Sequence, residues 1–185
     1  MERNNKILLR DSTALLLIDI QEKILNVMLN KENLIENCIK LIKGFKVLNL
    51  PVFFTEQYPK GLGPTTHYLQ KELEGLNSIQ KTSFSCIGAG NLFQRLKDNN
   101  IKQVVIAGIE SHVCVQQTVL DLLANNFQVD VCADAVSSRK ETDLNIALER
   151  MRNNNVEITS VESVLFELLQ ESRTEEFKKI SAIIK

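Results

Sequence analysis

The chain has 185 residues and a formal net charge of −1, with 44% hydrophobic and 24% charged residues. This composition is typical of a globular protein that buries one well-developed core, and we predict a single domain over residues 1–185. A charge so close to zero creates no field that would attract nucleic acid or anionic lipid, so we expect neither nucleic acid nor a membrane as a partner.

The sequence shows no sign of a membrane or secreted protein. No apolar run reaches the roughly 18 to 20 residues that a helix needs to cross a bilayer. The first residues, "MERNNKILLRDS", are polar and lack the apolar stretch of a signal peptide. The four cysteines (Cys38, Cys86, Cys114 and Cys132) are far apart and form no CxxC pair, which is more typical of reduced thiols than of a disulfide framework. We therefore expect a cytoplasmic protein.

Patterns of buried strands alternate with patterns of amphipathic helices along the whole chain. The first strand pattern, "TALLLIDIQ" (13–21), is apolar up to Asp19, and apolar residues at helical spacing follow in 31–49. Further strands are predicted at 51–57, 78–85, 103–109, 128–136 and early in 156–169, and further helices at 91–100, 115–126, after residue 138 and late in 156–169. Residues 58–69, rich in Gly and Pro, are predicted as a loop, and Ser138 and Glu141 have the spacing of a helix capping box.

Continuous apolar strands separated by helices are typical of a parallel sheet that is covered on both faces. Because crossover connections are right-handed, we predict an α/β fold: a doubly wound, Rossmann-like three-layer αβα sandwich with a six-stranded, mainly parallel sheet. In such sheets ligands bind at the carboxyl ends of the strands. The polar residues expected at that edge are Asp19, Gln21, Glu56, Gln57, Lys81, Asp134 and the turn from Glu110 to Cys114.

The segment "VVIAGIESHVCVQQTVLDLL" (104–123) places Cys114 where a strand passes into a helix. A helix N-terminus favours a thiolate over a thiol, and a nearby Lys81 would act in the same direction. Asp19 could take and return the proton, and N–H groups at the helix start could bind an oxyanion. A nucleophile, a base, a cation and an anion site together favour attack on a carbonyl or amidine carbon.

Each of these residues also has a simpler interpretation. Cysteines are commonly buried as packing residues, Asp19 could form a turn, and Lys81 could be a solvated charge. His112 is more typical of a packing or capping neighbour than of a general base. Asp134 could simply pair with Arg139.

Motifs for metals and nucleotides are incomplete. The only histidines, His67 and His112, do not have the spacing of metal ligands, and "GAGNLF" (88–93) has Phe93 where a dinucleotide-binding loop needs its third glycine. We therefore expect neither a metal nor a cofactor.

Three segments resemble, in order and spacing, the signature segments of the isochorismatase-like, or cysteine hydrolase, superfamily. They are "LLLIDIQEKI" (15–24), "QKTSFS" (80–85) and "AGIESHVCVQQT" (107–118). The further segment "TEQYPKGLGPT" (55–65) is similar to the isochorismatase-domain-containing proteins of this superfamily. The resemblance implies the isochorismatase-like hydrolase fold and a homo-oligomer.

The resemblance also implies roles for individual residues. Asp19 would be the general base, Lys81 its electrostatic partner and Cys114 the nucleophile. A cis peptide between Ile109 and Glu110 would place the N–H groups of Glu110 and Cys114 as an oxyanion hole. The residues expected to line the substrate pocket are Gln21, Tyr58, Phe84 and His112.

The implied activity is hydrolysis of a C–N bond in a small amide, ureide or carbamoyl compound through a thioester at Cys114. Metal-dependent nicotinamidases of the superfamily carry metal ligands after the second strand, where this chain has Glu56 and Gln57, so that activity is disfavoured. True isochorismatases generally lack the cysteine, and Cys114 therefore disfavours their vinyl-ether cleavage. The alternative is a catalytically inactive interaction protein, or a redox-responsive protein, on the same fold.

Overall fold

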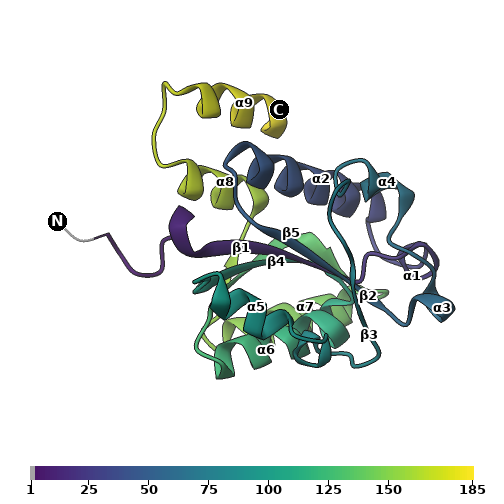
Figure 1. Ribbon diagram of the computed structural model, residues 1–185. Coiled ribbons are helices and arrows are strands. Elements are labelled where there is room, and N and C mark those ends of the chain that lie inside the picture. The colour runs from purple at the N-terminus through teal and green to yellow at the C-terminus, as the bar shows by residue number, and fades with distance from the viewer. Residues whose placement is uncertain (1–2) are drawn as a thin grey trace.

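The computed structural model describes residues 3–185, and its centre is a six-stranded parallel sheet (Figure 1). The strand order is β3-β2-β1-β4-β5-β6, and each neighbouring pair is parallel. The strands are β1 (Thr13–Ile18), β2 (Val52–Gln57), β3 (Ile79–Lys81), β4 (Gln103–Ile109), β5 (Gln128–Ser137) and β6 (Glu157–Thr159). The predicted α/β sandwich is confirmed, with a sheet that is entirely rather than mainly parallel.

Helices cover both faces of this sheet (Figure 1). One face carries α2 (Lys31–Val47), α8 (Val161–Leu169) and α9 (Glu175–Ile184), and the other carries α5 (Leu92–Asp98), α6 (Gln116–Ala124) and α7 (Glu141–Arg152). The short helices are α1 (Glu22–Leu25), α3 (Pro59–Leu62) and α4 (His67–Gln70), with 3-10 turns η1 (Arg10–Ser12) and η2 (Cys86–Gly88) and a π-helical turn η3 (Ser111–Val115). None of the helices within residues 3–185 is long and apolar enough to cross a membrane.

The alternation of side chains along β1 divides the hydrophobic core into two layers. Leu15 and Leu17 pack in the layer under α2, α8 and α9, whereas Leu16 and Ile18 pack in the layer under α5, α6 and α7. Successive side chains of a strand point to opposite faces, and all six residues of β1 are buried. This explains why the strand reads as a continuous apolar run.

Three local predictions differ from the structure. The first strand ends at Ile18, because Asp19 takes a left-handed conformation with φ of 52°. The predicted loop 58–69 contains α3 and part of α4. The predicted capping box is wrong: Lys140 occupies the N-cap of α7, while Ser138 is buried and its hydroxyl lies 2.9 Å from Nδ1 of His112.

The suggested pairing of Asp134 with Arg139 is also wrong. The register between β4 and β5 shifts between Ile106 and Gly108, and Asp134 lies in the part of β5 that bulges there. Its carboxylate accepts hydrogen bonds from Val161 N at the start of α8, at 3.0 and 3.2 Å. Arg139 instead pairs with Glu110.

Candidate active site

The sheet order brings the predicted chemical residues to one edge of the molecule. Asp19 directly follows β1, Lys81 is the last residue of β3, and Cys114 lies in the π-helical turn that follows β4. Gly108 allows the ends of β1 and β4 to approach closely, because a Cβ on it would lie 2.2 Å from the carbonyl oxygen of Ile18. The predicted convergence at the carboxyl ends of the strands is therefore observed.

Asp19 and Lys81 form a buried ion pair. Lys81 Nζ lies 2.6 Å from Asp19 Oδ2, and the side chains are 0% and 3% exposed. The ammonium also lies 2.8 Å from Gln57 Oε1, 2.9 Å from the carbonyl oxygen of Phe84 and 3.1 Å from that of Ser83. An ammonium has only three N–H donors, so protein oxygens already satisfy all of them. Lys81 is thus placed to act on Asp19 rather than to donate to a ligand.

Asp19 is held from both its backbone and its side chain. Its left-handed conformation is one that Asp tolerates better than most residues, and its carbonyl accepts a hydrogen bond from Gln21 N at 2.8 Å. The second carboxylate oxygen, Oδ1, accepts a hydrogen bond from Thr55 Oγ1 at 2.8 Å. Both carboxylate oxygens therefore have a donor, and the side chain is fixed in one orientation.

Cys114 is a buried thiol rather than the expected thiolate. It is 7% exposed, and burial raises its pKa to about 12, with the negative charge of Asp19 acting in the same direction and the positive charge of Lys81 opposing both. The charge of Lys81 does not prevail because burial of the thiol has the largest effect and Asp19 adds to it. The expectation of a resting thiolate is wrong, and ionisation of Cys114 requires a base.

The turn before Cys114 has the backbone geometry that the family resemblance implied. The peptide bond between Ile109 and Glu110 is cis. The carbonyl of Glu110 accepts hydrogen bonds from the N–H groups of Val113 and Val115, which closes the π-helical turn around Cys114. The Glu110 carboxylate lies 2.7 Å from Nε of Arg139 and is mostly buried.

The four residues expected to line the substrate pocket lie in different environments. Gln21 is fully buried, and its side-chain amide bonds to the backbone of Gln57 and Gly63. Tyr58 and Phe84 are about half exposed, at 54% and 55%. His112 is partly buried, with Nδ1 near Ser138. Gln21 thus holds the chain after β2, whereas Tyr58 and Phe84 have free surface.

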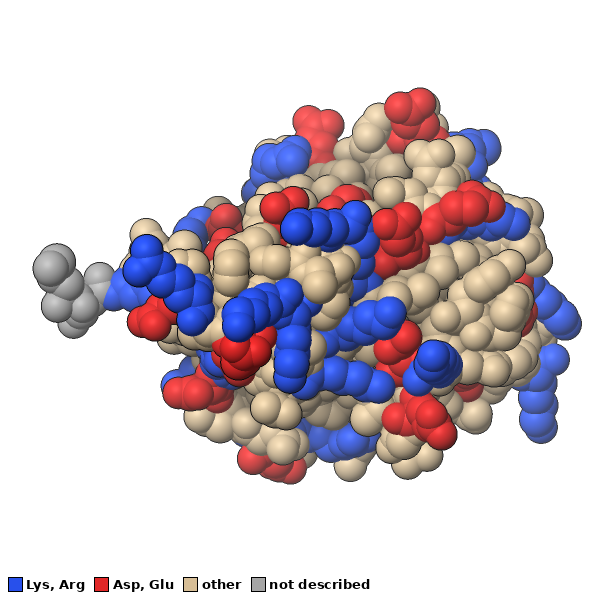
Figure 2. All heavy atoms as spheres, turned by 90° about the horizontal axis from the view of Figure 1, so that it is seen from above, with Lys and Arg blue, Asp and Glu red and all other residues tan. Residues whose placement is uncertain are grey.

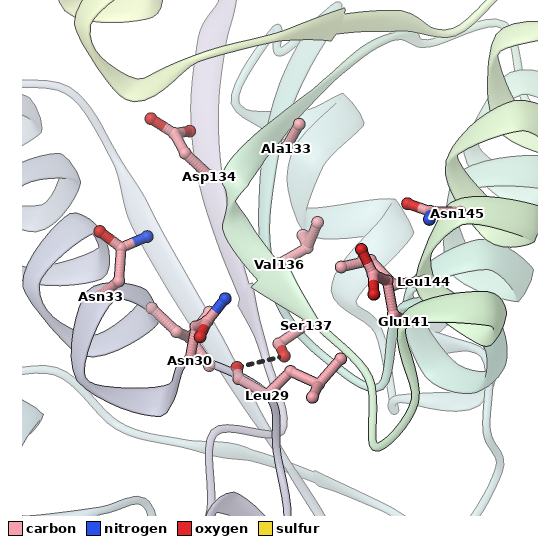
Figure 3. A pocket seen from close by; sticks show the side chains of 11 residues that line it. Leu29, Asn30, Asn33, Ala133, Asp134, Val136, Ser137, Glu141, Leu144 and Asn145 are labelled. Carbon is pink, nitrogen blue, oxygen red and sulfur yellow. Dashed lines mark hydrogen bonds between the residues drawn. The ribbon is translucent and has the colours of Figure 1, made fainter.

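Two of the cavities near the carboxyl edge of the sheet are candidates for a substrate site. One of about 430 Å³ borders Lys81 and is lined by Tyr58, Pro59, Lys60, Gln80, Lys81, Thr82 and Gly88. The other, of about 360 Å³, lies between α2, β5 and α7, and its polar lining includes Asn30, Asp134 and Glu141 (Figure 3). Of the residues expected at the ligand-binding edge the second cavity contains only Asp134, whereas the first contains Lys81 and Tyr58, so the first is the better candidate for a substrate cavity.

The segment after β2, where the family resemblance implied metal ligands in nicotinamidases, is occupied here by internal hydrogen bonds. Glu56 accepts from the N–H and the hydroxyl of Thr65, at 2.7 and 2.9 Å, and Gln57 accepts from Lys81. Within the described residues 3–185, no group of three or more His, Cys, Asp or Glu side chains is arranged to hold a metal ion.

Three further buried residues, which no sequence motif indicated, connect Asp19 to Cys114 on the core side of the site. Thr55, Cys86 and Thr118 are buried next to Asp19 and Cys114, and all three have hydrogen bonds or sulfur contacts within the cluster. Cys86, a cysteine without any sequence motif, is one of them. The signal for Thr55 in the sequence was its hydroxyl, which directly follows the apolar residues at the start of β2.

Solved structures with the same fold define the class of protein. The chain matches the MAR1 ribonuclease of Caenorhabditis elegans with a TM-score of 0.90 and 36% identity, over 96% of this chain and 91% of that one. It also matches the YcaC gene product of Escherichia coli, described as an octameric hydrolase of unknown specificity, with a TM-score of 0.91, 22% identity, and coverage of 99% and 91%. The fold is that of the isochorismatase-type hydrolases.

Sequence comparison gives the family. Residues 13–163 match the isochorismatase domain. Isochorismatase domain-containing protein 2 of Danio rerio is 38% identical over 172 residues, which is 93% of this chain and 86% of that protein. The chain belongs to the isochorismatase family, as its signature segments predicted.

Proposed function

We propose that the protein is a cysteine hydrolase that cleaves a C–N bond of a small amide, ureide or carbamoyl compound. The observation that supports this proposal is the buried Asp19–Lys81 ion pair close enough to the buried thiol of Cys114 for both charges to shift its pKa. A neutral thiol beside a fixed carboxylate suits a reaction in which proton removal and attack occur together.

The proposed reaction has two halves. Asp19 removes the thiol proton as the sulfur attacks the carbonyl carbon, and the same proton passes to the leaving nitrogen as the C–N bond breaks. Ammonia or an amine leaves, and a thioester remains on Cys114. Asp19 then removes a proton from water, which attacks the thioester, and the acid is released as the proton returns to the sulfur. Lys81 stays charged throughout and holds Asp19 in place.

The negative charge that develops on the substrate oxygen needs donors of its own, because Lys81 has none to spare. We assign this role to the backbone N–H groups of Glu110 and Cys114. The cavity beside Lys81, with Tyr58 on its wall, would hold the rest of the substrate.

The direct test is release of ammonia from a panel of small amides, ureides and carbamoyl compounds. For any substrate that is turned over, Cys114→Ala and Asp19→Asn should each lower kcat by roughly a thousandfold or more. The matched control is Cys132→Ala. Cys132 is also a buried cysteine but lies on β5, away from the proposed triad, and this variant should keep the activity of the wild type. Full turnover by Cys114→Ala would exclude the mechanism.

A second candidate function is cleavage of RNA, because a relative of 36% identity is described as a ribonuclease. The charge distribution disfavours it. On the face shown in Figure 2, Lys and Arg side chains are interspersed with Asp and Glu, and the whole chain has a net charge of −1. RNA binding usually depends on a basic surface that displaces counterions. RNA degradation by the wild type but not by Cys114→Ala would favour this candidate instead.

The two alternatives without hydrolysis also have distinct signatures. A redox-responsive role needs an oxidisable thiolate, and burial raises the pKa values of Cys114 and Cys86 to about 12 and about 11, which makes both poor targets for peroxide. An inactive interaction protein would turn over no compound of the panel.

A further inference from the structure

A buried threonine donates a hydrogen bond to Asp19, the proposed base. Thr55 lies on β2, is 1% exposed, and its Oγ1 lies 2.8 Å from Oδ1 of Asp19. A carboxylate can only accept a hydrogen bond, so the single hydroxyl proton of Thr55 is committed to Asp19. The bond is therefore charge-assisted and buried, which is the stronger kind.

This assignment also determines which atom is the hydrogen-bond donor in the contact between Thr55 and Cys86. Thr55 Oγ1 also lies 3.8 Å from Sγ of Cys86, and either atom could in principle be the donor. Because the proton of Thr55 already points to Asp19, the S–H of Cys86 must be the donor in this contact. Cys86 thus holds the hydroxyl of Thr55 in the orientation that serves Asp19.

The same cluster continues to the nucleophile. The N–H of Cys86 donates to Oγ1 of Thr118 at 2.9 Å, and Thr118 Oγ1 donates to the carbonyl of Cys114 at 2.7 Å. Cys86 and Thr118 are both fully buried. One chain of contacts therefore links the backbone of Cys114 to the carboxylate of Asp19 without involving Lys81.

We propose that Thr55 is a positioning residue for Asp19: its hydroxyl fixes the carboxylate in the orientation that receives the Cys114 proton and stabilises the carboxylate form. This inference rests on the proposed function, because it assigns Thr55 a role only if Asp19 is the base. Cys86 and Thr118 support the same arrangement from the side of the nucleophile.

The test uses a substrate-independent reaction, the alkylation of Cys114 by acrylamide, followed by mass spectrometry between pH 5 and 10. A thiol with a pKa of about 12 that reacts only after ionising by itself should react about ten times faster with each pH unit. Proton removal by Asp19 adds a component that does not depend on pH around neutrality, seen as a shoulder in the profile. We expect this shoulder in the wild type and its loss in Asp19→Asn.

Variants at position 55 separate a positioning role from simple packing. Thr55→Val keeps the shape but removes the proton, and should lower the shoulder by about 10-fold to 100-fold. Thr55→Ser keeps the hydroxyl but loses a methyl group, and should stay within a few-fold of the wild type. A packing role predicts the opposite order, because only the serine variant leaves a cavity.

Thr13→Val is the matched control. Thr13 is also fully buried, and its hydroxyl bonds to Leu9 and Gln103 at the other end of β1. The Thr13→Val variant should leave the pH profile of alkylation unchanged. Thermal unfolding shows whether each variant is folded. If Thr55→Val does not fold, Thr55→Ala replaces it. If Thr55→Val shows the same shoulder as the wild type, the proposed role of Thr55 is overturned but the role of Asp19 as base is not. A wild type without a shoulder overturns both this inference and the role of Asp19 as base.

Discussion

Lys81 carries a positive charge into a site where its side chain has no exposed surface. Such a charge is tolerated only when the protein replaces its water, and the carboxylate of Asp19 with three further oxygens does so. The arrangement also explains why Cys114 stays protonated. Burial of the thiol and the negative charge of Asp19 raise the pKa of Cys114 by more than the positive charge of Lys81 lowers it, so the proton of the thiol must leave in the course of the reaction.

Removal of the lysine charge should therefore be costly for stability. Lys81→Met leaves the buried carboxylate of Asp19 without its partner, and we expect the free energy of unfolding to fall by about 3 to 5 kcal/mol. Urea denaturation measures this loss.

The double variant Lys81→Met with Asp19→Asn should recover part of that loss, because no buried charge remains. Lys178→Met breaks an exposed pair with Glu175 and should change stability by less than about 1 kcal/mol. Equal effects at positions 81 and 178 would contradict a buried, energetically coupled pair.

At the scale of elements, β5 carries the clearest link between structure and pH. Asp130 lies on this strand between β4 and β6, is 3% exposed, and accepts a hydrogen bond from Gln128 Nε2 at 3.0 Å. Burial raises its pKa from 3.8 to about 7, and the bond from Gln128 only partly opposes this. The folded protein consequently holds a proton on Asp130 over a pH range in which the unfolded chain has released it.

Stability should fall as the pH rises across that range. Between about pH 4 and 7 the folded state binds more protons than the unfolded state, so the unfolding free energy decreases with pH and the stabilisation is lost above 7. A shift of this size corresponds to at most about 4 kcal/mol.

Asp130→Asn removes the titration. It should raise stability at pH 8, leave it nearly unchanged at pH 4, and flatten the profile in between, as measured by chemical denaturation. Asp98→Asn on the exposed end of α5 is the control. A variant as pH-dependent as the wild type would show that another group is responsible.

The whole molecule has a surface of mixed charge and a scattered set of exposed apolar side chains. Val27, Tyr68 and Ile146 are all more than half exposed, as are Phe84 and Ile87 near the candidate site. On the face shown in Figure 2, a group of neighbouring Lys and Arg side chains lies across the middle, with Asp and Glu side chains around it. A surface of this kind can meet a second copy of itself without strong repulsion.

We therefore expect the protein to be a homo-oligomer, as the family resemblance also implied. Light scattering after size exclusion should give a mass that is a multiple of 21.0 kDa. The mass should persist on dilution over the concentrations used. A single 21.0 kDa species at all concentrations would contradict the prediction.

The sequence alone determined the architecture and the position of the chemical residues. The unbroken apolar runs of β1 and β4 are buried on both faces, and only a parallel sheet covered by helices on both sides provides that environment. Since parallel strands end at a common edge, the strand pattern already predicts that Asp19, Lys81 and Cys114 lie together.

The behaviour of these residues depends on contacts between segments that are distant in sequence. The protonation of Cys114 depends on its burial and on the balance between two charges from other strands, and neither quantity is encoded in the helix start beside it. Ser138 shows the same limit, because a buried partner, His112, takes the hydroxyl that local spacing assigned to a helix cap. The links through Thr55 and Cys86 join side chains that are distant in sequence, so local patterns contain no record of them. Patterns along the chain indicate which side chains are buried. The protonation states and hydrogen bonds at the site depend on which of these buried groups contact one another.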